Sequence, residues 1–462
     1  SYYYAGIAVG AYRCVSAKTG YYKLTKNIYM SEAEVATCTE HIVKMNPRAG
    51  GTATDSWEPS SYHDHTDEVL GLEAYNADIS QWPEYADVFT TPWFTQPHAN
   101  QQITTQAQAE AFLEELDEED DNMYIFSIGK SSIYAHDVWA VFFTKTDLSA
   151  AKTYEEAGEL MGQDKPAGLY RAQIHGNEPA AGEGALAMVQ RMDGVYGEEV
   201  LENINVIMVP RASPDGAREF KRTIINSIDP NRDMLRLKSQ EITDYVKLFN
   251  AVKPELVIDG HEYDGYINST YHWDSDITVG LHYTGNNTEA YANKNMELAH
   301  GIFDAMKANG LSYNYYSSRV NSYNNTSVSR PYFGQQGALS ILLETRGNGA
   351  GLVSYARRII SHVVSVEYLL SYVSDNAASV QQLVDNEKQQ IIEKGKTYRE
   401  DIPVHRSHFL HGREVHPEPG LSGRHRKAGF SDTHHCKRCK AFPYRPHRLC
   451  DPGRRFLYGD GA

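Results

Sequence analysis

Short apolar runs alternate with amphipathic segments through the middle of the chain. Five runs are short, rich in β-branched residues and almost continuously apolar, which is typical of strands covered on both faces. Between them, three segments repeat apolar positions with the period of a helix. This alternation predicts an α/β fold with a mixed, largely parallel sheet flanked by helices. The predicted strands are 138–143, 169–174, 204–209, 256–258 and 340–343, and the helices are 182–192, 242–252 and 295–306.

Further helices are predicted on both sides of this region. Thr104-Thr105-Gln106 opens a helical pattern, residues 355–373 form a long amphipathic closing helix, and residues 377–394 form a more polar one. The first hundred residues have no motif and are interrupted by prolines such as Pro59, Pro83, Pro92 and Pro97, so they read as irregular or short-stranded. We therefore divide the chain into an N-terminal extension (1–103), a main domain (104–374), a C-terminal helix (375–402) and a tail (403–462).

Composition and charge exclude some classes of protein. The chain has 462 residues, of which 41% are hydrophobic, and its 44 Lys and Arg against 60 Asp and Glu give a net charge of −16. That charge argues against a nucleic-acid partner, because binding to phosphates needs an excess of positive charge. We predict no membrane span, because no run of about 18 apolar residues occurs.

The charge changes sign at the tail. Residues 403–462 hold 12 Lys and Arg against 5 Asp and Glu, together with 8 of the 19 His and 3 of the 5 Cys. The few apolar residues and the lack of periodicity predict a disordered segment, and the abrupt shift also resembles translation in a wrong reading frame. The alternative is a structural zinc site, because Cys436-x-x-Cys439 is followed by His447 and Cys450 at workable spacing.

Localisation is inferred indirectly. The chain begins at Ser1 without a visible leader, so we expect that any targeting segment has been removed. Cys14 and Cys38 could form a disulfide in an exported protein, and two cysteines in the acidic part are also compatible with reduced thiols. We predict an extracytoplasmic or secreted protein.

Candidate chemistry gathers where three predicted strands end. His175 and Glu178 follow one strand, His261 follows another, and Glu344 ends a third. In open α/β sheets the carboxyl ends of the strands form the crevice in which ligands bind. Two His and one Glu are the ligand set of a catalytic zinc ion that leaves a position for water. Glu344 could then take a proton from that water and return it to a leaving amine.

This order of residues resembles the zinc carboxypeptidase family, the carboxypeptidase A-like peptidases, over roughly residues 104–374. His-x-x-Glu after a strand, a distant His and a strand-terminal Glu carry the resemblance. Residues 127–131 resemble the family's opening hairpin, and residues 213–216 resemble its Asn-Pro-Asp-Gly turn with Ser in place of Asn. The resemblance implies hydrolysis of the C-terminal peptide bond of a peptide with a free carboxylate, with one catalytic zinc ion held by His175, Glu178 and His261.

The resemblance also implies roles for residues after that turn. Arg222 would polarise the scissile carbonyl, and Asn231 with Arg232 would bind the terminal carboxylate, which a planar guanidinium can hold through two parallel hydrogen bonds. Tyr323 stands near the place of the family's mobile tyrosine. If that match is right, Arg330 falls near the base of the side-chain pocket and would favour a C-terminal Asp or Glu; a slip of one residue would put Ser329 there.

Other functions stay open at this point. The 86 residues from His175 to His261 are fewer than in the digestive carboxypeptidases, so the loops that shape the pocket must differ. His-Gly-Asn-Glu also occurs in zinc deacylases of the aspartoacylase and succinylglutamate desuccinylase type, which lack the opening hairpin. A cell-wall peptide amidase and a non-catalytic binding module are further alternatives; Glu344 and Arg222 argue against the latter, because binding alone needs neither.

Overall fold

The structure is a computed structural model, and it describes ten stretches of the chain. These are residues 10–16, 24–30, 79–97, 102–263, 266–267, 272–273, 275–282, 286–316, 325–347 and 355–397. The proposed tail, Cys38 and Tyr323 lie outside the described residues, so the disulfide, the tail's metal site and the tyrosine stay predictions. No helix in the described part of the chain combines the length and the apolar character that crossing a membrane requires.

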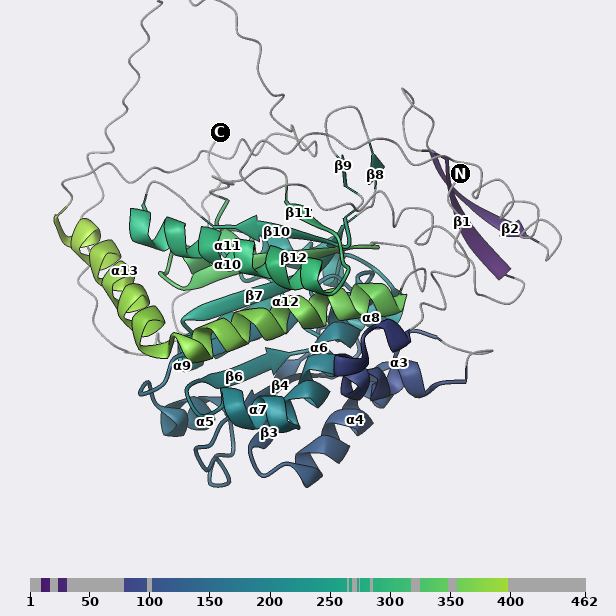
Figure 1. The fold of residues 1–462 in the computed structure, drawn as a ribbon. Helices are drawn as coiled ribbons and strands as arrows, with labels where there is room; N and C mark the ends of the chain where they lie inside the picture. The colour runs from purple at the N-terminus through teal and green to yellow at the C-terminus, as the bar shows by residue number, and fades with distance from the viewer. Residues whose placement is uncertain are drawn as a thin grey trace, which may run out of the picture. The chain divides into compact units, whose positions relative to one another are not determined.

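A mixed eight-stranded sheet forms the centre of the fold (Figure 1). The four central strands run parallel to one another, and an antiparallel strand joins them on each side. The predicted α/β fold with a mixed, largely parallel sheet is confirmed. In spatial order the strands are β11 (Tyr313–Tyr315), β10 (Ile277–Leu281), β12 (Leu339–Arg346), β7 (Leu256–Tyr263), β5 (Ala167–Ala172), β6 (Asn205–Val209), β4 (Asp137–Phe143) and β3 (Met123–Lys130).

Two small antiparallel ladders complete the described strands. They pair β1 (Gly10–Ser16) with β2 (Leu24–Met30) and β8 (Tyr266–Ile267) with β9 (His272–Trp273). In the large sheet, β3 and β4 form an antiparallel hairpin with a register shift between Ser127 and Gly129. This hairpin contains the residues that resemble the family's opening hairpin.

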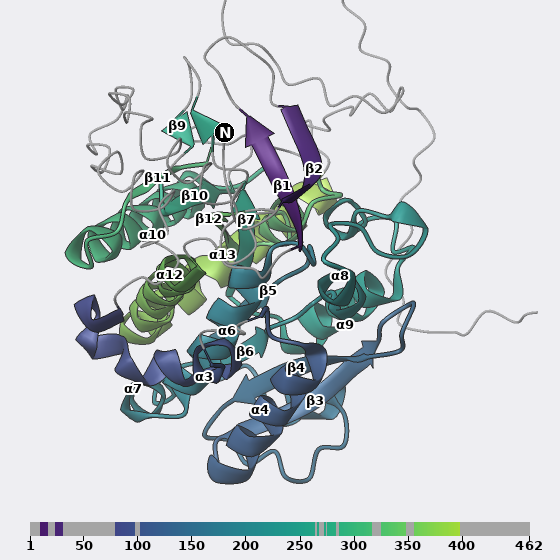
Figure 2. The same ribbon diagram turned by 90° about the vertical axis from the view of Figure 1, so that its right-hand side faces the viewer.

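Helices cover both faces of the sheet, because its central strands are apolar on both faces. Along β5, Leu169 belongs to one buried cluster and Tyr170 to the other, and Val257 and Ile258 of β7 divide in the same way. Figure 2 shows α10, α12 and α7 on the left of the strands and α8 and α9 on the right. The sheet is therefore the middle of three layers.

The helices have the following bounds. The first cluster includes residues of α4 (Gln106–Glu119), α6 (Pro179–Met192), α7 (Val195–Val200), α10 (Glu289–Ala308), α12 (Tyr355–Asp375) and α13 (Ala377–Thr397). The second includes residues of α5 (Tyr154–Met161), α9 (Gln240–Val252) and α11 (Ser329–Gly334). Shorter elements are η2 (Ile79–Gln81), η3 (Pro83–Thr90), α3 (Pro92–Thr95), α8 (Pro214–Glu219), η5 (Ile225–Ser227) and η6 (Pro230–Arg232).

Part of the predicted N-terminal extension packs into the main domain. Trp82 and Trp93 are almost fully buried in the first cluster, and η3 contacts α6. The buried carboxylate of Glu183 in α6 accepts hydrogen bonds from the Thr91 hydroxyl, the Trp93 backbone N–H and the Thr104 hydroxyl. Residues 79–97 therefore belong to the same core as α6. Short elements interrupted by prolines show no periodic pattern of apolar residues, which is why the sequence alone separates them from the main domain.

Candidate metal centre and active site

Strand register brings the candidate residues together at the carboxyl end of the sheet. Glu344 of β12 lies opposite His261 of β7, and Asp259 of β7 lies opposite Arg171 of β5. His175 follows three residues after β5 ends at Ala172. Because these three strands are parallel neighbours, residues at their carboxyl ends meet at one edge of the sheet.

Three side chains form a cluster that could hold a metal ion. The ligand atoms of His175, Glu178 and His261 lie within 4.8 Å of one another, and all three residues are buried. His175 Nδ1 is 2.7 Å from Glu178 Oε1, and His261 Nδ1 is 2.8 Å from Glu178 Oε2. Both Nδ1 atoms thus face the same carboxylate. The predicted ligand triad is brought together as the sequence order suggests.

The loop that carries His175 and Glu178 is held in an unusual backbone conformation. Gln173 has a φ of 48°, in the left-handed region that side chains rarely adopt. Its side chain donates to the Gly176 carbonyl and accepts from Arg211. A Cβ at Gly176 would lie 1.7 Å from the Gly216 carbonyl carbon, so only glycine fits there. The loop therefore packs directly on the turn that resembles Asn-Pro-Asp-Gly.

Each histidine has a second carboxylate behind it. His175 Nε2 is 3.1 Å from Asp229 Oδ1, and His261 Nε2 is 3.2 Å from Asp259 Oδ1. A histidine that binds a metal typically donates its other ring N–H to a carboxylate, which fixes the orientation of the ring. Two inward Nδ1 atoms, one inward carboxylate and two outward carboxylates therefore suit a divalent cation. The donor set fits the implied metal.

The charges around this cluster are consistent with a cation site. Burial raises the pKa of Glu178, but the charges of His175 and His261 outweigh it and hold the pKa well below the usual range. Burial likewise opposes the charge on His261, but Asp259 and Glu178 raise its pKa to about 10. The carboxylates thus create a negative potential that favours a positive charge at this position.

Arg222 lies at the open side of the cluster. Its Nη1 is 3.2 Å from His175 Nδ1 and 3.5 Å from Glu178 Oε1, and its side chain is 39% exposed. Its Nε donates to Asp229 Oδ2 at 3.0 Å. Burial raises the pKa of Asp229, but the hydrogen bond with His175 and the charges of His175 and Arg222 hold it well below the usual range. A partly exposed guanidinium beside the ligands is able to contact a bound substrate.

Asn231 and Arg232 lie in η6, next to the second histidine. Asn231 Nδ2 is 3.0 Å from His261 Nε2, and its Oδ1 accepts from the backbone N–H and the hydroxyl of Ser329, both at 2.9 Å. Arg232 donates to the Asn231 carbonyl at 2.8 Å. Asp229 caps this short helix by accepting from the Asn231 N–H. The predicted carboxylate-binding pair thus adjoins the metal cluster.

Glu344 is partly exposed and within electrostatic range of the cluster. Desolvation raises its pKa to about 7, while the charges of His261 and Arg222 act in the opposite direction. A carboxyl group with a pKa near neutrality suits a general base. The charge of Glu344 is also the largest influence on Tyr316, whose pKa it raises above the usual range.

Arg330 is buried in α11 and is not a solvated loop residue. It is 3% exposed, and its guanidinium lies 6.0 Å from the centre of the Tyr316 ring. A Cβ at Gly280 would lie 2.0 Å from Arg330 Nη1, so the glycine leaves room for the guanidinium. Arg330, Arg232 and Arg222 all lower the pKa of Tyr316, so all three lie within electrostatic range of that ring.

Sequence reasoning missed four residues of this neighbourhood: Asp229, Asp259, Ser329 in its bonding role, and Tyr316. Asp229 stands two residues before Asn231, and Asp259 stands two residues before His261. An acidic residue two positions before a predicted ligand or carboxylate-binding residue could therefore have been recognised in the sequence. Tyr316 follows β11 in a Tyr-rich stretch, where nothing distinguishes it from its neighbours.

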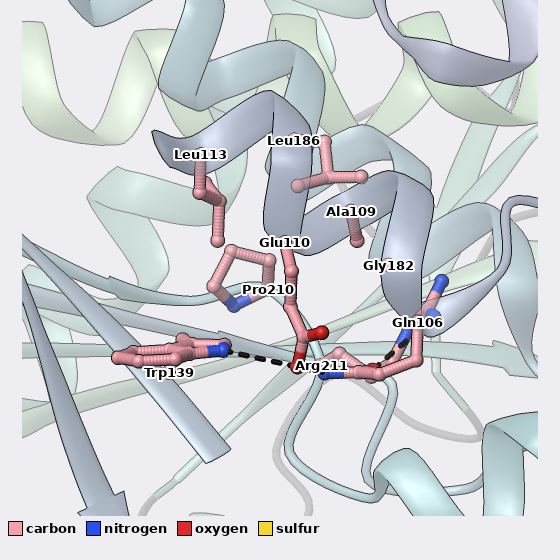
Figure 3. Close-up of a pocket in the computed structure, with 9 residues that line it drawn as sticks. All are labelled: Gln106, Ala109, Glu110, Leu113, Trp139, Gly182, Leu186, Pro210 and Arg211. Atoms are coloured by element: carbon pink, nitrogen blue, oxygen red, sulfur yellow. Dashed lines mark hydrogen bonds between the residues drawn. The ribbon is translucent and has the colours of Figure 1, made fainter. Parts of the chain in front are cut away.

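A separate pocket lies between α4, β4 and α6 (Figure 3). Figure 3 shows Trp139 bonded to Glu110, and Arg211 bonded to Gln106. None of the candidate metal-binding or substrate-binding residues lines this pocket. We therefore do not assign it to the site.

The chain is similar in sequence to curated carboxypeptidases. It is 26% identical over 236 residues to carboxypeptidase 2 of Trichophyton equinum, and the aligned region covers 46% of this chain and 43% of that protein. It is 28% identical over 114 residues to carboxypeptidase SOL1 of Arabidopsis thaliana, which covers 24% of this chain and 21% of that one. The chain therefore spans less than half the length of these curated relatives. No family model matches it.

The fold is also similar to solved structures. The superposition on a structure of thrombin-activatable fibrinolysis inhibitor covers 67% of this chain and 82% of that chain, with 14% sequence identity and a TM-score of 0.48. At this level the structural likeness carries no argument about activity. The sequence relatives and the ligand triad are what bear on function.

Proposed function

We propose that this chain, a zinc carboxypeptidase-like protein, is a metallocarboxypeptidase that hydrolyses the C-terminal peptide bond of peptides. The observation that carries the proposal is the cluster of His175, Glu178 and His261, with Arg222 on its open side and Glu344 within electrostatic range. Binding alone would require neither Glu344 nor Arg222. Similarity to curated carboxypeptidases supports the same assignment.

Zinc is the proposed ion, held by the two Nδ1 atoms and the Glu178 carboxylate. Imidazole nitrogen with one carboxylate is a typical ligand set for catalytic zinc. When bound, zinc would act as a Lewis acid and make a water molecule acidic near neutral pH. Asp229 and Asp259 would keep the outer ring nitrogens protonated, so that Nδ1 of each imidazole is free to bind.

The chain's own groups would carry out the proton transfers. Glu344 would accept a proton from the attacking water as the new carbon–oxygen bond forms, and would donate it to the leaving nitrogen as the peptide bond breaks. Arg222 would donate hydrogen bonds to the oxygen that becomes negative during attack. Its partial exposure and its bond to Asp229 support this role, because the guanidinium is oriented but still accessible.

Asn231 and Arg232 would bind the terminal carboxylate and so restrict cleavage to chain ends. Asn231 Oδ1 is occupied by Ser329, which leaves its amide nitrogen to donate to an anion. Tyr323, outside the described residues, stays a proposed third contact. Arginine can bind a carboxylate through two parallel hydrogen bonds, which makes it suited to this task.

Arg330 is the proposed determinant of side-chain preference. A buried guanidinium beside Tyr316, with Gly280 giving it room, would favour a C-terminal Asp or Glu. Burial and the charge of Arg330 lower the pKa of neighbouring His282 to about 3, so His282 is neutral and Arg330 carries the local positive charge. A buried cation discriminates strongly between charged side chains, because water screens it little.

The test is hydrolysis of a panel of blocked dipeptides that differ in the C-terminal residue. We expect release of the last amino acid, loss of activity with a zinc chelator, and recovery on adding zinc back. Amidation of the C-terminal carboxylate should abolish cleavage. Cleavage of N-acylated single amino acids, with none of dipeptides, would instead favour a deacylase; cleavage of cell-wall stem peptides alone would favour an amidase.

The same panel tests Arg330. We expect the wild-type chain to prefer acidic C-terminal residues and Arg330→Asp to reverse the order of kcat/KM between acidic and basic ones. Arg236→Asp is a control for the same change of charge at an exposed arginine, whose Nη2 donates to the Arg232 carbonyl and whose Nε lies 3.6 Å from Asp233 Oδ1. Unchanged ratios in the Arg330 variant would reject this role and leave the carboxypeptidase proposal standing.

The place of action is also a proposal. We propose that the protein acts outside the cytoplasm, supported by the acidic composition of residues 1–402 and by the peptidase-like site. Detection of the protein in culture medium against a cytoplasmic marker would test it.

A further inference from the structure

The two outward carboxylates behind the metal cluster are embedded differently. Asp229 lies before η6 and is 23% exposed, whereas Asp259 lies within β7 and is 2% exposed at its side chain. Asp259 also forms a buried ion pair with Arg171, which is 1% exposed. A buried ion pair is by itself weak evidence for a role in stability, because well-packed apolar residues of similar volume often stabilise a fold as well. Its position suggests another use.

The register of the sheet sets this pair directly beneath His261. Arg171 of β5 and Asp259 of β7 are opposite one another, and His261 is two residues further along β7, on the same face as Asp259. The Arg171 guanidinium is fixed from a second side, because it lies 4.7 Å from the centre of the Tyr245 ring. Asp259 is thereby held at a fixed distance from the imidazole.

Hydrogen-bonding chemistry assigns Asp259 a specific partner. Among the described residues, His261 Nε2 has two polar neighbours, Asp259 Oδ1 at 3.2 Å and Asn231 Nδ2 at 3.0 Å. If His261 Nδ1 binds a metal, Nε2 carries the ring proton and must donate it. An amide nitrogen cannot accept a hydrogen bond, so of these two neighbours only the Asp259 carboxylate can accept one from Nε2–H. The amide nitrogen of Asn231 is then left for a substrate.

Ser329 connects the same carboxylate to the substrate side. Its hydroxyl contacts Asp259 Oδ2, Arg171 Nη2 at 2.9 Å and Asn231 Oδ1 at 2.9 Å. Its backbone N–H also donates to Asn231 Oδ1. One serine therefore touches both the group that supports His261 and the amide proposed to bind a carboxylate.

We propose that Arg171, Asp259 and Ser329 form a buried positioning cluster that sets the metal affinity of His261 and orients Asn231 for substrate. Asp259 accepts a hydrogen bond from Nε2–H of His261 and so keeps Nδ1 of that ring turned toward Glu178. Arg171 pairs with Asp259 and holds it in place, and Ser329 links this support to Asn231. The proposal rests on the proposed metal-dependent function, and none of the three residues touches the substrate.

The principal test compares two pairs of substitutions that remove the same kind of ion pair. Arg171→Gln with Asp259→Asn neutralises the proposed cluster without leaving one buried charge alone. Arg357→Gln with Asp276→Asn neutralises a buried Arg–Asp pair that touches none of the three metal ligands, with Arg346 4.0 Å from Asp276 as a further neighbour. Zinc dissociation constants are measured by competition with a chromophoric chelator, and thermal unfolding is followed in the metal-free proteins.

We expect the first pair to weaken zinc binding by about 10–100-fold, as is usual when a ligand's supporting group is lost. The second pair should change zinc binding by less than about threefold, although both lower the unfolding temperature of the metal-free protein. Equal zinc affinity in the two double variants would overturn the proposal. A wild-type chain that binds zinc but cleaves no peptide would reject the proposed function and still allow this comparison; one that binds no zinc would reject both.

Ser329→Ala tests the link to the substrate side with a smaller change. It removes the hydroxyl but keeps the backbone N–H that donates to Asn231. We expect a KM for a blocked dipeptide raised about fivefold or more and a zinc affinity reduced less than in the Arg171/Asp259 double variant. If KM and zinc affinity both stay within twofold of wild type, Ser329 does not connect the two.

Discussion

The candidate site has one half built on strands and one half built on loops. His261, Asp259 and Glu344 come from β7 and β12, where strand register fixes their relative positions. Arg222 and Asp229 come from irregular segments after α8, where hydrogen bonds between side chains do the positioning. His261 and Asp259 of the strand half are buried, whereas Arg222 and Asp229 of the loop half are partly exposed.

This difference indicates a division of tasks. Groups that must keep a fixed geometry, such as a metal ligand and a base, gain from a rigid sheet edge. Groups that must meet and release a substrate gain from segments that water reaches. His175 and Glu178 join the halves, because their loop follows β5 but packs on the turn at Gly216. Substitutions in the two halves should therefore fail in different ways.

The largest effect is expected at Glu344, in the strand half. Glu344→Gln keeps the size of the side chain but removes the proton acceptor, so kcat should fall by about 10³-fold. Zinc content should stay at the wild-type ratio, since Glu344 is not among the clustered ligands. Single-turnover rates and metal analysis of the same sample check both points. Full activity in this variant would remove Glu344 from the base role.

A somewhat smaller effect is expected at Arg222, in the loop half. Arg222→Met removes donors that would stabilise the developing negative oxygen, so kcat should fall by about 10²–10³-fold with little change in zinc binding. Arg218→Met is a matched control, because Arg218 lies over the Tyr134 ring, 4.0 Å from its centre. Steady-state kinetics on one blocked dipeptide compare them. Equal losses in both variants would point to a structural cause.

The smallest effect is expected at Asp229, the carboxylate behind His175. Asp229→Asn should weaken zinc binding by about tenfold, toward the lower end of the range for supporting groups. The loss is limited because Asp229 is partly exposed, so that water can replace part of its hydrogen bonding. Competition with the same chelator gives the value. If this variant loses as much affinity as the Arg171/Asp259 double variant, the contrast between the two halves is wrong.

Much of the fold followed from local patterns. The runs at 138–143, 169–174, 204–209, 256–258 and 340–343 all correspond to strands of the large sheet. The helix predicted to open near Thr105 begins with a capping box in which Thr105 and Gln108 bond reciprocally. These features depend on neighbours within a few residues, so the sequence contains them.

Strand β7 shows where local patterns stop. The apolar run ends at Ile258, yet the strand continues to Tyr263 through three polar or charged residues and one glycine: Asp259, Gly260, His261 and Glu262. Those positions are buried because distant residues neutralise them: Arg171 pairs with Asp259, and Arg358 pairs with Glu262. A search for runs of apolar residues cannot detect the part of a strand whose buried side chains are polar.

By itself, the sequence determined the order of strands and helices and named the residues from His175 to Glu344 that carry the candidate chemistry. Their grouping followed from a physical rule, since the ends of parallel strands meet at one edge of a sheet. Only the tertiary structure decided which groups support them. Asp229, Arg171 and Ser329 act through contacts with residues 54, 88 and 98 positions away. Such contacts depend on how strands and loops pack, and that information is not local to any segment of the chain.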